Sequence, residues 1–289
     1  MKDSRSYQVF RVVNVVVLLG VLAVTLYPFL NIVAQSFSSE QFILTGQVNL
    51  VPRGFNLKTY EVVASDPMFW RNYVNTVIYT TTATLISIVL TTSYAYVLSK
   101  RHLKGRGLLI GIAVFTMFFN GGLIPNYVLI TSLGLKNTLW AVVLPNAISV
   151  FNLLVMKAFF ENLPNELEEA AAIDGLTTYG ILLRIVLPLS KAVIATMILF
   201  YAVANWNSWF SAFLYFDKSE LFPVTVYLRN MIAGASGATS VGTGQGDLAQ
   251  VASNIKAVTM VLTMLPILAV YPFIQRYFVS GVMLGAVKQ

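Results

Sequence analysis

The sequence predicts an all-α membrane protein with six transmembrane helices, and two properties of the chain carry that prediction. Hydrophobic residues make up 57% of the 289 residues and charged residues only 11%, whereas soluble domains are about one quarter charged. The chain also contains six uncharged stretches of about 20 residues, the length that a helix needs to cross the hydrocarbon of a bilayer. Open sheets are excluded in lipid, because every backbone polar group there must be bonded within the protein.

The six expected spans are residues 12–34, 73–99, 108–130, 139–156, 192–216 and 257–275. The third and fourth contain Pro125 and Pro145, so their ends are the least well defined. The first span is longer than the apolar core of a secretory signal, and no A-x-A cleavage site follows it, which favours an uncleaved helix. We expect residues 1–289 to form one domain.

Basic residues set the expected orientation, because Lys and Arg collect in the cytoplasmic loops of membrane proteins. Those before the first span and after the second are Lys2, Arg5, Arg11, Lys100, Arg101, Lys104 and Arg106. The long loops 35–72 and 217–256 each balance three basic with three acidic residues. We therefore expect both termini in the cytoplasm and interpret the basic loop as a topology determinant. The basic segments at the membrane also explain the net charge of +7, so no nucleic-acid partner is expected.

Several kinds of chemistry are excluded by the residue inventory. The chain has no cysteine and one histidine, His102, which leaves no thiolate site and no histidine cluster for a metal. It has no G-x4-G-K-[ST] sequence for a nucleotide phosphate, and we expect no cofactor on this chain. No span holds a charge in its middle, which argues against an ion-coupled carrier. A membrane-embedded hydrolase is disfavoured too, since the spans contain no carboxylate pair and no nucleophile–histidine set.

The segment 161–190, between the fourth and fifth spans, is expected to be cytoplasmic and is acidic. Its carboxylates are Glu161, Glu166, Glu168, Glu169 and Asp174. Asn165 with Glu168 predicts a capping box, and Gly175 fits the left-handed position that ends a helix. A second short helix is expected from Thr178 to Leu187, ended by Pro188. An anionic inner leaflet repels such a segment, which favours a protein partner; a solvated linker is the alternative.

Seven positions of this segment match a known motif. Glu169-Ala170-Ala171, Gly175, Ile185 and Leu187-Pro188 follow the pattern E-A-A-x3-G-x9-I-x-L-P. This resembles the EAA motif of the permease subunits of bacterial ABC importers, and it implies the type I importer permease fold. The resemblance assigns ATPase coupling to Glu169, Ala170, Ala171, Asp174, Gly175, Leu187 and Pro188.

The same resemblance implies a set of partners. They are a second permease subunit in a heterodimer, two cytoplasmic ATPase subunits that carry ATP and Mg, and a solute-binding protein outside. The chain itself is then a multi-pass protein of the bacterial cytoplasmic membrane. ATP-driven closure of the two ATPases pulls the coupling helices together and turns the cavity outward.

Two further segments resemble the carbohydrate-importer branch of the family, the maltose-permease type. They are Phe119-Asn120-Gly121-Gly122-Leu123-Ile124-Pro125 and residues 281–288. Within that branch the likeness is to the lipoprotein-L and YtcP-like subfamily, which implies complex oligosaccharides, often containing uronates, with alginate as one candidate cargo. A permease for a non-sugar solute is the alternative within the same fold.

Polar and aromatic residues inside the spans are candidates for the transport path. Sugars are commonly held by aromatic faces and amides, and the candidates are Asn205, Trp206, Asn207, Trp209, Asn120 and Asn152, with Asn146 beside them. An interfacial aromatic belt with interhelical amides is the alternative. The second span also carries Thr76, Thr80, Thr84, Ser87 and Thr91 on one side, a stripe that favours close helix packing over a hydroxyl-lined wall.

The last candidate is the stretch 233–246 of the expected outer loop. It has no charge and contains Gly234, Gly237, Gly242, Gly244 and Gly246, a composition typical of a flexible segment. By resemblance to the maltose-type subunit, this region reaches into the sugar-binding protein. A passive linker is the alternative.

Overall fold

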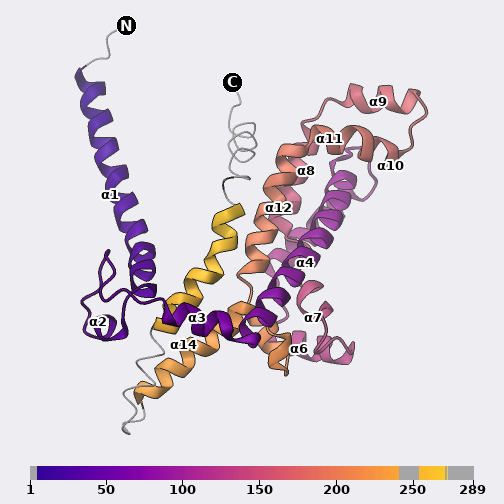
Figure 1. The fold of residues 1–289 in the computed structure, drawn as a ribbon. Helices are drawn as coiled ribbons and strands as arrows, with labels where there is room; N and C mark the ends of the chain where they lie inside the picture. The colour runs from indigo at the N-terminus through magenta and orange to yellow at the C-terminus, as the bar shows by residue number, and fades with distance from the viewer. Residues whose placement is uncertain (1–4, 241–253, 271, 273–289) are drawn as a thin grey trace. The chain divides into compact units, whose positions relative to one another are not determined.

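The computed structural model describes residues 5–240, 254–270 and 272, and the regular structure in these residues is helical (Figure 1). The longer elements are α1 (Arg5–Ser36), α3 (Lys58–Ser65), α4 (Pro67–Ser99), α5 (Arg106–Phe118), α6 (Leu123–Ser132), α8 (Val150–Glu161), α9 (Asn165–Ile173), α12 (Lys191–Trp206), α13 (Phe210–Tyr215) and α14 (Val224–Ser240). The short elements are α2 (Glu40–Leu44), α7 (Trp140–Val143), α10 (Thr178–Ile181), the π-helical turn η1 (Leu182–Val186), α11 (Leu187–Leu189) and the 3₁₀ turn η2 (Ser219–Leu221). A last helix covers Asn254–Val270.

The contacts divide the chain into two compact units. The first contains the described residues up to Trp70 and from Tyr227 to Leu265, and the second contains the rest. In the first unit, Ser38 joins three segments: its hydroxyl accepts a hydrogen bond from the Arg53 amide at 3.0 Å, and its carbonyl accepts one from Asn254. The Tyr227 hydroxyl of α14 donates to the Asp66 carboxylate, just before α4, at 2.7 Å.

The core of the second unit lies where α4, α8 and α12 meet. Leu98, Leu153, Met156 and Met197 are fully buried there, and Ala171 of α9 packs on the same cluster. We call this cluster the α4–α8–α12 core. A smaller apolar cluster joins α6, α7 and α13. Four residues of the polar stripe of α4 are buried and Thr80 is half-buried, and Thr91 shares a 2.6 Å hydrogen bond with Tyr201 of α12. The stripe therefore packs helices together, as its small residues indicated.

Two of the expected spans are long continuous helices. The apolar part of α1, Tyr7–Ser36, and α4, Pro67–Ser99, are long and apolar enough to cross a bilayer. The helix Asn254–Val270 covers the described part of the sixth expected span, of which residues 271 and 273–275 lie outside the described chain.

The third expected span, 108–130, is wrong as a single helix. The chain turns by 113° between α5 and α6. Gly122 at this turn has φ +93°, a conformation that L side chains rarely adopt, and its amide donates to the Asn120 side chain at 2.9 Å. The local turn chemistry of asparagine and glycine therefore outweighs the apolar run around it. Pro125 lies in the first turn of α6, where its missing N–H costs no helical hydrogen bond.

The fourth and fifth expected spans are also interrupted. In 139–156, α7 ends before Pro145, and α8 starts again behind Ser149, whose hydroxyl accepts from the Asn152 amide. In 192–216, α12 ends at Trp206. The Asn207 backbone amide donates to the Val203 carbonyl at 3.1 Å, and its side chain adds a second hydrogen bond to the same carbonyl at 2.9 Å. Uncharged composition predicted continuous helices here, but proline and asparagine end them.

The expected outer loop 217–256 contains regular structure. After η2, α14 runs to Ser240, so residues 233–240 are helical and the expectation of a flexible stretch is wrong for them. Ala233, Ala235 and Ala238 alternate with the glycines there, and alanine is the strongest helix former. Gly242, Gly244 and Gly246 lie outside the described residues.

A clamp of hydrogen bonds ties the turn after α6 to the end of α13. Asn137 has φ +60°; its side chain donates to the Asp217 carboxylate at 3.0 Å and accepts from the Asp217 amide at 2.7 Å. Lys136 lies 3.0 Å from the same carboxylate. The hydrogen bond from Asn137, followed by that from Lys136, lowers the pKa of Asp217. This pairing favours the folded state above the ordinary pKa of aspartate and is lost as pH falls through the lowered value.

Trp206, a candidate for the transport path, is a packing residue in this structure. Its indole is 7% exposed and lies edge-on to Tyr73 of α4, with ring centroids 5.8 Å apart. Trp209 is 36% exposed, and its ring contacts Phe210 and Phe213. The two tryptophans therefore differ in burial, although only two residues lie between them.

Asn137→Ala is expected to destabilise the protein by about 1 kcal/mol more than Asn137→Gly, because only alanine is strained at positive φ. Both substitutions remove the side-chain bonds to Asp217, so each is the control for the other. Thermal unfolding in detergent measures the difference. Equal melting temperatures for the two variants would contradict this account of Asn137.

Trp206→Ala is expected to cost about 3 kcal/mol of folding stability, because it empties a packed site against Tyr73. Trp209→Ala, the matched control, should cost much less because that side chain is more exposed. Thermal unfolding and the yield of folded protein from membranes measure both. Similar losses for the two variants would show that packing against Tyr73 has no special weight.

Candidate functional site

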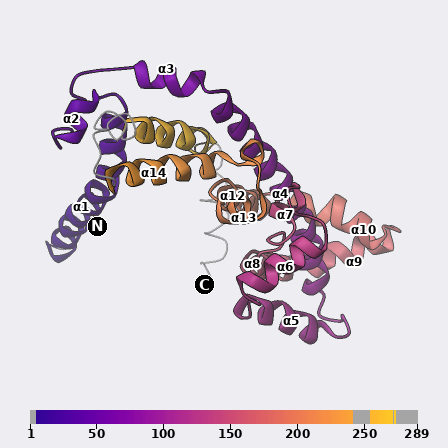
Figure 2. The same ribbon diagram turned by 90° about the horizontal axis from the view of Figure 1, so that it is seen from below.

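The segment between α8 and α12 stands out as a pair of helices beside the end of the α4–α8–α12 core. α9 lies next to α10, and the chain then runs through η1 and α11 before bending by 85° into α12 (Figures 1 and 2). Only Ala171 of α9 is buried, and it faces the core. The helix is therefore held by one side and leaves the other side open.

The open side of α9 carries most of the motif residues of this helix. Glu169 and Ala170 are exposed, as is Ile173, 86% of whose side chain is accessible. Glu166 lies one turn before Glu169 and is exposed as well. The E-A-A triplet is thus divided: Glu169 and Ala170 face outward, while Ala171 packs inward. This outward face of α9 offers a carboxylate beside an apolar side chain.

The turn after α9 has the geometry that its glycine predicted. Asp174 occupies the C-cap position, and Gly175 follows with φ +82°. The Gly175 amide donates to the Ala172 carbonyl at 3.0 Å, and the next amide donates to Ala171. These bonds satisfy carbonyls that the helix end would leave open. Both residues are exposed, so the turn belongs to the same accessible surface.

Two details of this segment differ from the expectation. Pro164, not Asn165, occupies the N-cap position of α9, and no side chain caps the helix there. The capping box does not form, because Asn165 is the first residue inside the helix and the N-cap position is taken by a proline. The Glu168 carboxylate binds Lys100. Pro188 does not end the second helix: α11 runs through it to Leu189, after η1. Leu187 is half-buried on the core, and Pro188 is exposed.

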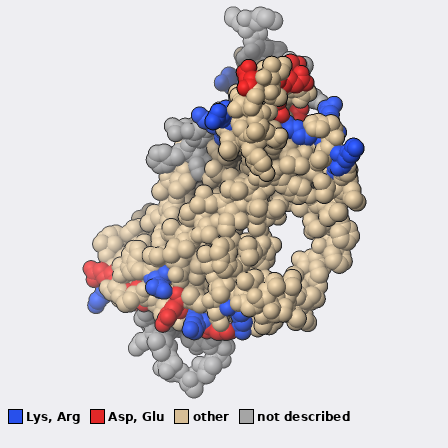
Figure 3. All heavy atoms as spheres, turned by 90° about the vertical axis from the view of Figure 1, so that its right-hand side faces the viewer, with Lys and Arg blue, Asp and Glu red and all other residues tan. Residues whose placement is uncertain are grey.

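The basic turn that follows α4 contacts this acidic segment, which the sequence alone did not indicate. Lys100 forms an ion pair with Glu168, and Arg106 forms one with Glu161. Figure 3 shows acidic and basic side chains close together at the end of the second unit that carries α9. The sequence did carry one signal for these pairs: both loops were expected on the cytoplasmic side of the membrane, and their charges are opposite.

A second region of interest is a hollow of about 900 Å³ between α8 and α12. Its lining brings together most of the amides that the sequence singled out: Asn146, Asn152, Asn205 and Asn207. Ser149, Ser208 and Tyr201 add hydroxyls, and the other lining residues are apolar, with no charged residue among them. An apolar wall with a few amides and hydroxyls suits a neutral polar ligand.

Asn205 holds the most unusual position in this hollow. Its side-chain nitrogen is buried and has no hydrogen-bond partner among the described residues. A buried donor without a partner costs about 1–3 kcal/mol. The same residue also lines a narrower hollow on the side of α4, together with Asn146. A ligand hydroxyl that reached this amide would remove that cost.

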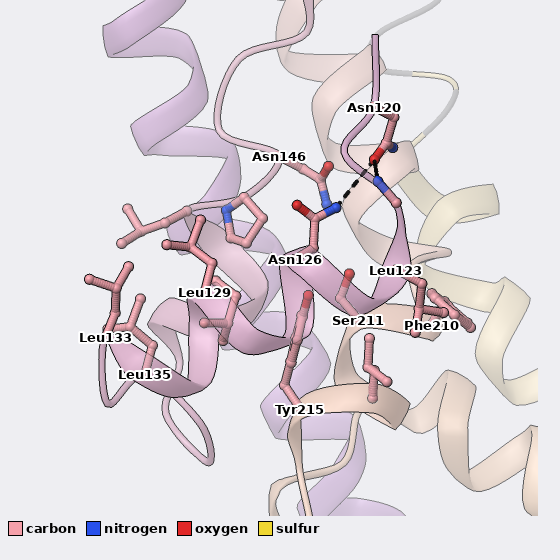
Figure 4. Close-up of a pocket in the computed structure, with 15 residues that line it drawn as sticks. Asn120, Leu123, Asn126, Leu129, Leu133, Leu135, Asn146, Phe210, Ser211 and Tyr215 are labelled. Atoms are coloured by element: carbon pink, nitrogen blue, oxygen red, sulfur yellow. Dashed lines mark hydrogen bonds between the residues drawn. The ribbon is translucent and has the colours of Figure 1, made fainter. Parts of the chain in front are cut away.

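A third hollow, of about 680 Å³, lies between α6 and α13 and holds Asn120. Figure 4 shows Asn120, Asn126 and Asn146 gathered near one end, with leucines at the other. Asn126 donates to Asn120 at 3.3 Å. Asn146 lines this hollow as well as the one between α8 and α12, so the two hollows share this polar residue.

The remaining candidates are placed elsewhere. Trp206 lines an apolar hollow beside Val270, and Trp209 lines none of the hollows described above. Gly234 and Gly237 belong to α14. Among the described residues, no group of three acidic, cysteine or histidine side chains could hold a metal ion.

Comparison with known proteins agrees with this arrangement. The chain is 42% identical to the protein LplC of Bacillus subtilis over all of its own length and 98% of that protein. It is 40% identical to the polygalacturonan/rhamnogalacturonan transport permease YtcP of the same organism, over 90% of this chain and 92% of the relative. A subunit in the crystal structure of a bacterial ABC transporter involved in the import of the acidic polysaccharide alginate matches with a TM-score of 0.85 and 32% identity, over 96% of this chain and 99% of that subunit.

The family comparison covers nearly the whole chain. The model of the binding-protein-dependent transport system inner membrane component matches residues 4–283. This match includes both the outward face of α9 and the hollows between the helices. The chain therefore belongs to the inner membrane components of binding-protein-dependent transport systems.

Proposed function

We propose that this chain is a permease subunit of an ATP-driven importer for oligosaccharides or polysaccharides, a class that includes uronate-containing chains such as alginate. The outward face of α9 carries the proposal. It presents Glu169 and Ala170 beside the exposed Ile173 on a helix whose other face is fixed to the core. A short helix with one buried and one open side is suited to dock in a cleft of another protein.

The partner of this face is a cytoplasmic ATPase, two copies of which supply ATP and Mg to the complex. Glu169 is exposed and is therefore available to a basic residue of the ATPase. Asp174 and Gly175 extend the same surface, and Leu187 and Pro188 connect it to α12. Since the sequence has no phosphate-binding loop, the energy for transport comes from the partner. Both termini then lie in the cytoplasm, and a second permease subunit completes the heterodimer.

The hollow between α8 and α12 is the part of the transport path that this subunit supplies. The amide nitrogen of Asn205 lacks a partner among the described residues, and a sugar hydroxyl would satisfy it. Asn207 and Asn152 supply further amides on the same lining, and Asn120 lies in the neighbouring hollow. Polysaccharide transport by the relatives supports a carbohydrate as cargo.

The solute-binding protein meets the opposite side of the membrane. The region from Gly234 to Gly246 is the proposed contact, including Gly237, Gly242 and Gly244. Its first seven residues, 234–240, belong to α14.

Glu169→Ala is expected to leave membrane insertion intact, because the residue lies outside the spans. It should lower the affinity for the ATPase about 30-fold, because truncating one partner of a buried charge pair costs about 2 kcal/mol or more. The ATPase should then co-purify poorly, and uptake should be abolished. Glu166→Ala removes a carboxylate of the same face one turn earlier and is the control, with a smaller expected effect. Full uptake and normal co-purification of Glu169→Ala would refute the docking surface.

Asn207→Ala is expected to reduce uptake of a uronate oligosaccharide several-fold while assembly with the ATPase and thermal stability stay unchanged. The matched control is Asn162→Ala: both asparagines donate to the carbonyl four residues earlier, at 2.9 Å, but only Asn207 lines the hollow. Uptake by proteoliposomes at low substrate concentration distinguishes them. Equal uptake by the two variants would place the sugar contacts in the other permease subunit.

A further inference from the structure

The basic turn between α4 and α5, residues 100–106, makes contacts that the proposed function does not use. Lys100 pairs with Glu168 of α9, 68 residues later, and Arg106 pairs with Glu161 at the end of α8, 55 residues later. All four side chains are between 19% and 26% exposed. The two pairs therefore lie at the rim of the core rather than in open solvent.

Each pair is fixed in place by further contacts. The Tyr96 hydroxyl donates to the Glu168 carboxylate at 3.3 Å, and the Lys100 ammonium lies 4.2 Å from the centre of the Tyr96 ring. On the other pair, the Arg106 Nε donates to the Leu98 carbonyl of α4 at 2.7 Å. Exposed ion pairs contribute little on their own, but a partly buried network with defined geometry contributes more.

The second pair also has a local support. Lys157 of α8 lies 2.9 Å from the Glu161 carboxylate, one helical turn before it. Glu161 thus accepts from two cations, one on its own helix and one from the basic turn. The end of α8, where segment 161–190 begins, is held from both sides.

Neighbouring residues of α9 have opposite surroundings. Glu169 is exposed, and Glu168 points to the basic turn and is bound by Lys100. The peptide chain connects α9 to α8 on one side and, through η1 and α11, to α12 on the other. The path along the peptide chain from α9 to α4 or α5 is much longer, because it passes through the whole of α8. The two ion pairs supply a direct connection.

We propose that Lys100 and Arg106 are positioning residues for coupling, which pass a displacement of α9 to α4 and α5. The proposal rests on the proposed function, because the ATPase causes the displacement. When α9 moves, Glu168 pulls on the end of α4 through Lys100, while Glu161 holds the start of α5 through Arg106. α4, which lines the narrower hollow with Thr76, Tyr79 and Ala83, and α5 then move together with segment 161–190.

The test is a charge exchange in the complete transporter with its ATPases, reconstituted in proteoliposomes with the binding protein. Lys100→Glu and Glu168→Lys are made singly and together, and uptake of a uronate oligosaccharide is measured beside ATP hydrolysis. Each single variant is expected to retain its ATPase subunits and to lose at least about tenfold in sugar taken up per ATP, the scale of coupling between contacting charges. The double variant restores the pair in reverse and should recover most of that loss.

Arg101→Glu is the matched control for the change of charge. Arg101 lies in the same basic turn and is exposed, and no ion pair to it is present in the described residues. It should transport as the wild type does. Because the chain has no cysteine, labelling of His102→Cys from one side of the membrane reports the orientation of every variant. Where charge reversal prevents assembly, Glu168→Gln keeps the size of the side chain and should uncouple transport in part.

The outcomes separate the two proposals. Wild-type uptake per ATP in both single variants, or a double variant no better than either single one among assembled complexes, would overturn the role of Lys100. Loss of ATPase subunits from Lys100→Glu, in the manner expected for Glu169→Ala, would assign the residue to docking and overturn the positioning role as well. The docking surface itself is judged by Glu169→Ala alone, so either proposal can fail without the other.

Discussion

Close packing between α4, α8 and α12 is the constraint on which the rest of this structure depends. Leu98, Leu153, Met156 and Met197 are fully buried at that junction, and Ala171 of α9 rests on the same cluster. The alanine is small, so α9 approaches the core closely while its other side stays open. The outward direction of Glu169 follows from this, because one face of a short helix is occupied by the core.

Much of this arrangement could be predicted from the residues, and the failures have physical causes. The E-A-A triplet and Gly175 predicted the helix and its left-handed end. The capping box at Asn165 was wrong, because the helix begins at Asn165 and its N-cap is Pro164. The ion pair of Glu168 with Lys100 was not predicted, because periodicity and capping describe neighbours along the chain, whereas these two residues are 68 positions apart.

The interrupted spans show a related limit. Hydropathy measures how well a stretch tolerates lipid, and by that measure residues 108–130, 139–156 and 192–216 are each continuous. The structure breaks them at Gly122, Pro145 and Asn207, where the backbone turns and side chains bond to the main chain. Irregular backbone at membrane depth is tolerated where it lines a cavity. Gly122 and Pro145 line the hollow between α6 and α13, and Asn207 lines the one between α8 and α12. Asn205 and Asn207 were selected for their amides, but they also mark where a helix ends.

The uncharged lining of the large hollow has a consequence for the range of cargo. Amides and hydroxyls do not titrate near neutral pH, and their hydrogen bonds are not screened by salt as interactions between separated charges are. A wall of this kind offers a uronate and its neutral counterpart the same hydroxyl contacts, and it is indifferent to the ionic strength of the surroundings. If this hollow is the transport path proposed above, selection by charge belongs to a component that the sugar meets before it reaches this wall.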